Sequence, residues 1–347
     1  MKRRSSGSER EDRMTEKPSR NLALELVRVT ESAALAAGRH MGRGDKIAGD
    51  RAAVDAMRLV LSSIEIDGVI VIGEGEKDEA PMLCNGERIG AGGAPVDIAV
   101  DPVDGTRLLA LGRSNALSTV AVAERGSMFF PGPIVYMEKL AVGPEAKGHI
   151  DLRAPIAYNL ASVARAKGAD VSDLTVVILD RPRHEALIGE VRKAGARIRL
   201  ITDGDVAGAL MTAWPDSGVD VLVGVGGSPE GVLAACALRC MGGELQARLY
   251  ARDEQEAAKA KAMGYDLDKV LSMDDLVRSE EIFFAATGIT DGELLRGVKY
   301  TGIGAETHSL VMRARTGTVR EIIATHRWDK LMALSEIEYD TEGGEAA

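Results

Sequence analysis

Aromatic residues, histidines and cysteines are all scarce in this chain of 347 residues. Because aromatic residues make up 3 % of it, we expect a core built mostly from aliphatic side chains. The five histidines are scattered along the chain, which argues against a histidine-based metal site. Cys84, Cys236 and Cys240 have no zinc-site spacing, so we expect buried thiols in a reducing compartment.

Excess positive charge and long apolar runs are absent as well. The formal net charge is −10, which argues against nucleic acid or an anionic membrane as the main partner. No apolar run approaches the ~18 residues that span a membrane, and the basic first segment lacks the apolar core of a signal peptide. We therefore expect a cytoplasmic protein with a disordered tail at residues 1–19 and a flexible tail at 336–347.

Several common active-site motifs are missing too. The chain has no Walker A loop, no Gly-x-Ser-x-Gly nucleophile motif and no His-Glu-x-x-His zinc motif. The glycine-rich stretch 224–231 resembles a dinucleotide fingerprint, but Pro229 stands at the place of the third glycine. The sequence therefore points away from nucleotide binding and serine hydrolase chemistry.

The first half of the chain mixes predicted helices and strands without regular alternation. Apolar spacing predicts helices at 21–38 and 51–63, with a glycine-rich loop at 41–50 between them. Short apolar runs predict strands at 69–73, 96–100, 116–123 and about 134–142. We therefore expect an α+β half at residues 20–170.

The second half alternates more regularly. Predicted strands are at 174–180, 196–202 and 219–225, and predicted helices at 184–195, 205–213 and 230–241. A charged helix at 251–263 and strands at 281–287 and 308–313 are expected to follow. This pattern predicts an α/β half at residues 171–335, with a ligand cleft between the halves at the strand ends.

Carboxylates gather where two strands of the first half are predicted to end. DPVDGT at 101–106 follows one strand, and GEGEKDE at 73–79 follows another. The first motif alone is equally consistent with a plain turn, because Asp-Gly and proline are common turn residues. If the acidic loops face one another, however, their repulsion calls for a hard cation such as Mg²⁺ or Mn²⁺. Two such ions could clamp the attacking and leaving oxygens of a phosphoryl transfer.

Charged residues also follow the strands of the second half. Arg181 and Arg183 flank a proline, where they form either a surface turn or a phosphate clamp. Asp203 and Asp205 either cap a helix or accept hydrogen bonds from sugar hydroxyls. Glu230 is either a favourable acid at a helix N-terminus or a metal ligand supplied across the cleft.

A series of ordered segments across about residues 20–330 resembles one phosphatase family. These segments are NLALELVRVTESAALAAG, GRGDK, VIGEGEKDEAPML, VDIAVDPVDGTR, MEKLAVGP, DRPRH, TDGDVA, GGSPEGVLAA and FFAATGIT. They resemble class II, or GlpX-type, fructose-1,6-bisphosphatases, within the inositol monophosphatase-like superfamily of lithium-sensitive, metal-dependent phosphatases. The resemblance implies a layered αβαβα sandwich.

The resemblance also implies an activity. It implies hydrolysis of the 1-phosphate of fructose 1,6-bisphosphate to fructose 6-phosphate and phosphate, a step of gluconeogenesis. The alternatives are sedoheptulose 1,7-bisphosphate as an additional or different substrate, another phosphatase activity of the superfamily, or a non-catalytic binder of metal or sugar phosphate. The complete set Asp78, Thr106 and Glu230 argues against the binder, which would have no need of a water-activating pair. We also expect a homo-oligomer, either a dimer or a tetramer.

Individual site residues follow from the resemblance by matching position. The metal ligands would be Asp50, Glu74, Asp101, Asp104 and Glu230, holding two or more Mg²⁺ or Mn²⁺ ions. Asp78 and Thr106 would act on the attacking water, with Lys46 essential nearby. The substrate site would be lined by Gly105, Thr106, Tyr136, Arg181, Pro182, Arg183, Asp203, Gly204, Asp205 and Gly227. Many relatives have Glu in place of Asp104 and some have Lys in place of Arg181, which alters ligand length and hydrogen-bond geometry.

Overall fold

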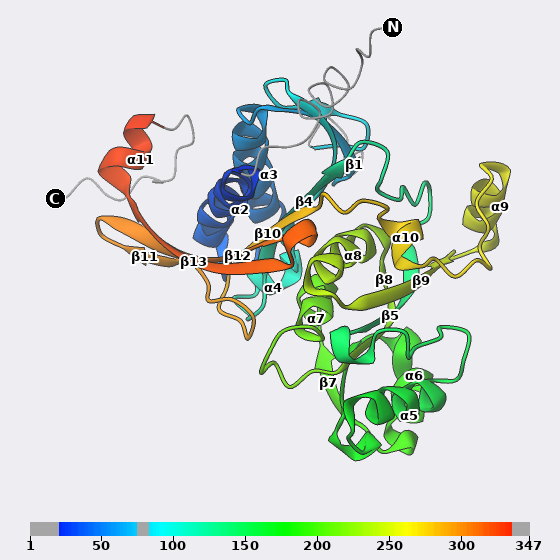
Figure 1. Ribbon diagram of the computed structural model, residues 1–347. Coiled ribbons are helices and arrows are strands. Elements are labelled where there is room, and N and C mark those ends of the chain that lie inside the picture. The colour runs from blue at the N-terminus through cyan, green and yellow to red at the C-terminus, as the bar shows by residue number, and fades with distance from the viewer. Residues whose placement is uncertain (1–20, 75–82, 335–347) are drawn as a thin grey trace, which may run out of the picture.

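The computed structural model describes residues 21–74 and 83–334, and within them two mixed β-sheets run through the molecule (Figure 1). The expected tails at 1–19 and 336–347 and the segment around Asp78 lie outside the described residues. The mixed α/β class expected from the sequence is confirmed. In the described part of the chain, no helix combines the length and apolarity needed to cross a membrane.

The first sheet has eight strands in the order β11-β12-β10-β4-β3-β1-β2, with β13 paired to the outer edge of β12. Its strands are β1 (Ile66–Ile72), β2 (Arg88–Ile89), β3 (Ala94–Asp104), β4 (Leu117–Glu124), β10 (Phe283–Gly288), β11 (Lys299–Thr301), β12 (Gly304–Arg313) and β13 (Thr318–Arg327). β1 and β3 are parallel, and the other pairs are antiparallel.

The second sheet has five strands in the order β7-β6-β8-β5-β9. Its strands are β5 (Tyr136–Val142), β6 (Thr175–Leu179), β7 (Arg197–Ile201), β8 (Val221–Gly227) and β9 (Glu244–Tyr250). β6 runs parallel to β7 and β8, whereas β5 is antiparallel to both of its neighbours. The carboxyl ends of β6, β7 and β8 therefore meet at one edge of this sheet, where ligands bind in such folds.

Three layers of helices alternate with the two sheets (Figure 1). α2 (Leu22–Ala37) and α3 (Lys46–Ser62) pack on the outer face of the first sheet. α7 (Asp205–Met211) and α8 (Ser228–Met241) lie between the sheets, and α5 (Ile156–Lys167) and α6 (Glu185–Ala194) cover the far face of the second. This order is the αβαβα sandwich that the sequence led us to expect.

The core between the sheets is aliphatic, as the shortage of aromatic residues predicts. Small and branched residues of α8 pack against both sheets, and Cys236 and Cys240 are buried among them. Burial raises the pKa of the Cys236 thiol to about 12, so this thiol is protonated and unreactive at neutral pH. Cys84 is half-buried, and all three cysteines are free. The expectation of buried thiols therefore holds for the two cysteines of α8.

Two of the element boundaries that differ from the sequence-based expectation move site residues. α3 begins at Lys46 rather than near residue 51, because the Asp45 carboxylate accepts hydrogen bonds from the backbone N–H groups of Ile47 and Ala48, both at 3.0 Å. β3 continues to Asp104 instead of ending at residue 100. Asp50 is therefore a helical residue, and the DPVD motif is part of a strand rather than a turn.

The chain crosses from the first sheet to the second and later returns to the first, which the alternation of helices and strands did not predict. β5 belongs to the second sheet although it precedes residue 171, and β10 to β13 return to the first sheet after the second is complete. The sheets therefore do not divide the chain at residues 170 and 171. The expected halves at 20–170 and 171–335 remain a prediction about domains.

Candidate active site

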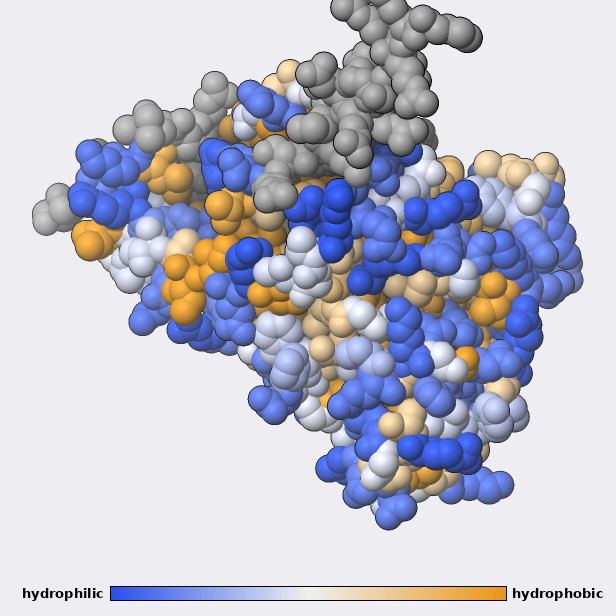
Figure 2. Space-filling view, viewed as in Figure 1, coloured by the Kyte–Doolittle hydropathy of each residue, from blue (hydrophilic) through white to orange (hydrophobic). Residues whose placement is uncertain are grey.

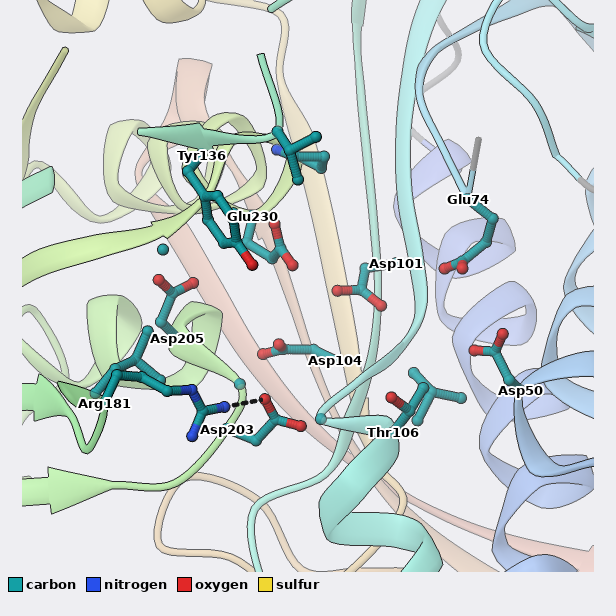
Figure 3. A pocket seen from close by; sticks show the side chains of 18 of the residues that line it. Asp50, Glu74, Asp101, Asp104, Thr106, Tyr136, Arg181, Asp203, Asp205 and Glu230 are labelled. Carbon is teal, nitrogen blue, oxygen red and sulfur yellow. Dashed lines mark hydrogen bonds and ion pairs between the residues drawn. The ribbon is translucent and has the colours of Figure 1, made fainter. Parts of the chain in front are cut away.

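A cavity of about 380 Å³ opens where the two sheets face each other, and most of the predicted site residues line it (Figure 3). The predicted residues along this cavity are Asp50, Glu74, Asp101, Asp104, Gly105, Thr106, Tyr136, Arg181, Arg183, Asp203, Gly204, Asp205, Gly227 and Glu230. Lys46 is exposed at the start of α3 and does not line the cavity, and neither does Pro182. Asp78 lies outside the described residues.

Two carboxylates reach the cavity because β3 is irregular at its end. In a regular strand, residues three apart point to opposite faces of the sheet. The pairing of β3 with β4 shifts register between Asp101 and Asp104, so the strand is locally reoriented and both side chains line one cavity. Gly105 then adopts a left-handed conformation with φ of 91°, which a residue with a side chain rarely adopts, and α4 (Thr106–Ala110) begins directly after it.

The remaining acidic residues come from three other elements. Asp50 is buried in the second turn of α3, and Glu74 follows the end of β1. Glu230 lies in the first turn of α8, on the opposite wall. Figure 3 shows these carboxylates directed toward the space around Asp101 and Asp104. The early start of α3 matters here, because it fixes Asp50 on a rigid helix.

Burial and mutual repulsion make these carboxylates costly to ionise. Burial, followed by the charge of the neighbouring Asp104, raises the pKa of Asp101 well above its usual value. Burial, followed by the charge of Asp205, likewise raises the pKa of Asp104 and of Glu230. Among the described residues, no hydrogen-bond donor reaches Oδ2 of Asp104 or Oε2 of Glu230. A hard divalent cation fits this donor set, because it prefers carboxylate oxygens and offsets their charge.

These carboxylates do not yet form a coordination sphere. Among the described residues, no three Asp, Glu, His or Cys side chains are arranged closely enough to hold one ion as they stand. The cavity brings the five predicted ligands to one place, and their individual assignment as ligands remains a prediction.

The opposite wall carries cations at the end of β6. Arg181 donates from Nη2 to Oδ1 of Asp203 at 3.1 Å, so the two predicted substrate residues are already paired. Arg183 donates from Nε and Nη2 to the carbonyl oxygen of Val225, at 3.1 and 2.6 Å. Its guanidinium carbon lies 5.1 Å from the centre of the Tyr136 ring. These contacts hold both guanidinium groups at the cavity, where their remaining N–H groups can bind phosphate oxygens.

His184 supports this wall and was not anticipated as a site residue. Its ring accepts a hydrogen bond from the backbone N–H of Val225 at Nε2 and donates from Nδ1 to the carbonyl oxygen of Leu179, both at 2.7 Å. The ring therefore joins the end of β6 to β8, next to Arg183. Burial lowers the pKa of His184, which favours this neutral form. The DRPRH segment does not predict this role, because a proline between two charged residues after a strand is also typical of a surface turn.

Lys139 is a second residue that the sequence reading missed. It lies in the middle of β5 and is buried, and its Nζ is 2.5 Å from Oδ2 of Asp205, a residue that lines the cavity. The sequence YMEKLAV contained a signal for it. In a strand with one face toward the core, Lys139 has the same inward orientation as the buried residues Met137 and Ala141.

Comparisons with known proteins agree on one family. The family described as "Bacterial fructose-1,6-bisphosphatase, glpX-encoded" matches residues 20–326. Fructose-1,6-bisphosphatase 1 class 2 of Escherichia coli strain K12 is 51% identical over 325 residues, covering 90% of this chain and 96% of the relative. Fructose-1,6-bisphosphatase class 2 of Escherichia coli O6:H1 and that of Shigella flexneri match with the same identity and coverage. With a match that spans nearly the whole fold and includes every described residue of the cavity, the chain belongs to the glpX-encoded bacterial fructose-1,6-bisphosphatases, the class 2 enzymes.

Proposed function

We propose that this protein is a phosphoric monoester hydrolase that converts fructose 1,6-bisphosphate and water to fructose 6-phosphate and phosphate, as gluconeogenesis requires. One observation carries the proposal: a single cavity has a cluster of carboxylates on one side and two arginines on the other. Such a cavity suits a substrate with one reacting and one non-reacting phosphate. Membership of the class 2 family supports the same activity.

The acidic side of the cavity would hold two or more Mg²⁺ or Mn²⁺ ions. Its ligands would be Asp50 on α3, Glu74 after the end of β1, Asp101 and Asp104 on β3, and Glu230 on α8. When bound, the ions would neutralise charge on the reacting phosphate and make the attacking water a stronger nucleophile. The protein's own contribution is a set of buried oxygens held by β3, α3 and α8.

Thr106 would orient the attacking water, and Asp78 would accept a proton. Thr106 lines the cavity as the first residue of α4, directly after the left-handed Gly105. A hydroxyl held in that place can accept a hydrogen bond from water and pass its own proton to a carboxylate. Asp78 would be that carboxylate, and Lys46, one helical turn before Asp50, would balance charge at the rim.

The cationic side would bind the part of the substrate that does not react. Arg181 and Arg183 would hold the 6-phosphate, and the ring of Tyr136 would keep the guanidinium group of Arg183 in place. Asp203 and Asp205 would accept hydrogen bonds from sugar hydroxyls. Pro182, Gly204 and Gly227 would shape the backbone around the sugar, since Gly204 already lies close to Asp104 of the opposite wall.

We also propose that the protein acts as a dimer or tetramer. Support comes from the edge of the first sheet, where Ile303 and Ile323 are exposed. Figure 2 shows apolar residues gathered over the β11–β13 end of the molecule, and β13 pairs on one side with β12. Sedimentation equilibrium of the full chain would measure the assembly directly, and a single species with the monomer mass would contradict it.

A panel of phosphate esters tests the activity. Phosphate release should be measured from fructose 1,6-bisphosphate, sedoheptulose 1,7-bisphosphate, inositol 1-phosphate and a nucleoside 3′-phosphate, each with Mg²⁺ and with Mn²⁺. We expect the highest kcat/KM on fructose 1,6-bisphosphate. The variant Asp101→Asn is the control, because the loss of one carboxylate at the centre of the cluster should remove most turnover. Higher kcat/KM on inositol 1-phosphate or the nucleotide would contradict the proposal.

A further inference from the structure

Lys139 is a fully buried lysine that the proposed reaction does not use. Its exposed fraction is 1 %, and it is among the largest side chains buried to that extent in the described chain. Lysine is rarely buried so completely, because removing an ammonium group from water is costly unless it is paired and hydrogen-bonded. The partners that compensate this buried charge therefore indicate what Lys139 does in the fold.

The ammonium group connects two parts of the cavity wall from behind. Nζ of Lys139 lies 2.5 Å from Oδ2 of Asp205 and donates to the carbonyl oxygen of Gly227 at 3.0 Å. Asp205 is the first residue of α7, and Gly227 ends β8, so one side chain on β5 joins two other elements. Lys139 itself does not line the cavity.

Gly226 provides the space in which this ion pair sits. A Cβ added to Gly226 would lie 1.9 Å from Oδ2 of Asp205 and 2.8 Å from Nζ of Lys139. Both distances are below the 3.0 Å that real Cβ atoms keep, so any larger residue would displace the pair. The absence of a side chain at Gly226 thus leaves room for the ion pair between Lys139 and Asp205 next to the cavity.

The ion pair between Lys139 and Asp205 also affects the charge balance of the cavity. Among the described residues, seven carboxylates and two arginines line the cavity, so negative charge is in excess there. Of the two carboxylates proposed to bind the sugar, Asp203 is paired with Arg181 at the surface of the cavity and Asp205 with Lys139 beneath it. Lys139 also opposes the rise in the pKa of Glu230. Each proposed sugar-binding carboxylate therefore has a cation of its own.

We propose that Lys139 is a positioning residue that fixes the carboxylate of Asp205 for substrate binding. By occupying Oδ2, it leaves the other oxygen of Asp205 to accept a hydrogen bond from a sugar hydroxyl, in one orientation. A carboxylate held in advance loses less entropy when the substrate binds. This inference rests on the proposed function, because it names the group that sets affinity for the non-reacting part of the substrate.

The variant Lys139→Met tests the proposal in the full-length protein with metal present. Methionine keeps an unbranched side chain but removes the charge and both hydrogen bonds. We expect KM for fructose 1,6-bisphosphate to rise at least about tenfold, the effect of losing a charge-assisted hydrogen bond, while kcat changes by less than about threefold. KM rises selectively because Asp205 contacts a part of the substrate that is bound alike in the ground and transition states.

Lys167→Met is the matched control. Lys167 pairs with Asp220 at 2.6 Å and with Glu145 at 3.0 Å, at the end of α5 and away from the cavity. The same substitution there removes two ion pairs from the helix layer that covers the second sheet. It should leave KM and kcat within about twofold of the unaltered protein.

A double variant separates positioning from general damage. If Lys139 acts through Asp205, then Lys139→Met combined with Asp205→Asn should have a KM within about twofold of Asp205→Asn alone. Independent effects would multiply, which would overturn the proposal. An unchanged KM in folded Lys139→Met, or a collapse of kcat at constant KM, would overturn it too.

Gly226→Ala takes the place of Lys139→Met if that variant does not fold. Its methyl group displaces the ion pair while both charges remain in the chain, so KM should again rise at least about tenfold. A KM equal to that of the unaltered protein would overturn the proposal. Failure of the proposed function looks different, because the unaltered protein would then release no phosphate from fructose 1,6-bisphosphate.

Discussion

Asp101 and Asp104 hold two carboxyl groups in a place that is unfavourable for both. Burial and neighbouring acids raise the pKa of each, and Oδ2 of Asp104 has no hydrogen-bond donor among the described residues. Uncompensated groups of this kind destabilise a folded chain. Such groups gather at functional sites, and the proposed function gives them a role as ligands of cations.

The hydroxyl of Thr106 provides a prediction at this scale. Thr106→Val keeps the shape of the side chain and removes the group proposed to orient the attacking water. We expect kcat to fall at least about a hundredfold, the usual contribution of proton-transfer assistance, with KM and metal affinity largely unchanged. Initial rates of phosphate release measure this. Thr325→Val on β13, far from the cavity, is the control, and near-normal turnover by Thr106→Val would refute the assigned role.

A second prediction concerns Arg183, which contacts the backbone of Val225 and the ring of Tyr136. Arg183→Ala should raise KM for fructose 1,6-bisphosphate more than it lowers kcat, because the 6-phosphate is bound similarly before and during the reaction. Arg183→Lys should restore KM only in part, since lysine keeps the charge but not the two-pronged geometry. A collapsed kcat with an unchanged KM would place Arg183 at the reacting phosphate instead.

The structural elements show how far the sequence alone predicts this site. Strand and helix periodicity located most of the helices and strands, and DPVDGT and RPR located both walls of the cavity. The register shift between Asp101 and Asp104 could not be predicted, because it arises from pairing with β4, which is distant in sequence. β13 was missed because one face of it is exposed and polar residues interrupt its pattern. Lys139 was missed because lysine is rarely buried completely, so its side chain alone does not indicate a role inside the fold.

The packing of α2 on the first sheet gives a prediction about pH. Glu31 of α2 is buried, accepts a hydrogen bond from the hydroxyl of Thr307 at 3.1 Å and lies 4.0 Å from Nε2 of His326. Burial raises its pKa from 4.5 to about 7, although the Thr307 hydrogen bond acts in the opposite direction. Since the folded chain keeps the proton longer than the unfolded chain, the free energy of unfolding falls as pH rises from 4.5 to about 7.

Glu31→Gln should remove this pH dependence and keep the hydrogen bond. The variant should unfold with nearly the same free energy as the unaltered protein at about pH 4, and be more stable by up to about 3 kcal/mol at about pH 8. Urea unfolding at both pH values measures the difference. Glu25→Gln, at a half-buried position on the same helix where Glu25 pairs with Arg28, serves as control. An equal difference at both pH values would show that Glu31 is already ionised when folded.

At the scale of the whole molecule, the active site exists because two sheets with different construction face each other. The first sheet and the helices outside it supply Asp50, Glu74, Asp101 and Asp104, and the second sheet with α7 and α8 supplies the arginines, Asp205 and Glu230. No local pattern predicts that β10 to β13 rejoin the first sheet, because their partners are far away in sequence. The family resemblance predicted the layers, whereas periodicity alone predicted only alternating elements.

Dependence on a divalent cation is the central claim, and one measurement tests it directly. The initial rate of phosphate release from fructose 1,6-bisphosphate should be followed after exhaustive chelation and then during titration with Mg²⁺ or Mn²⁺. We predict that chelation abolishes turnover and that added cation restores it, since the described lining of the cavity has seven carboxylates against two arginines. Full turnover by the chelated protein would contradict the account.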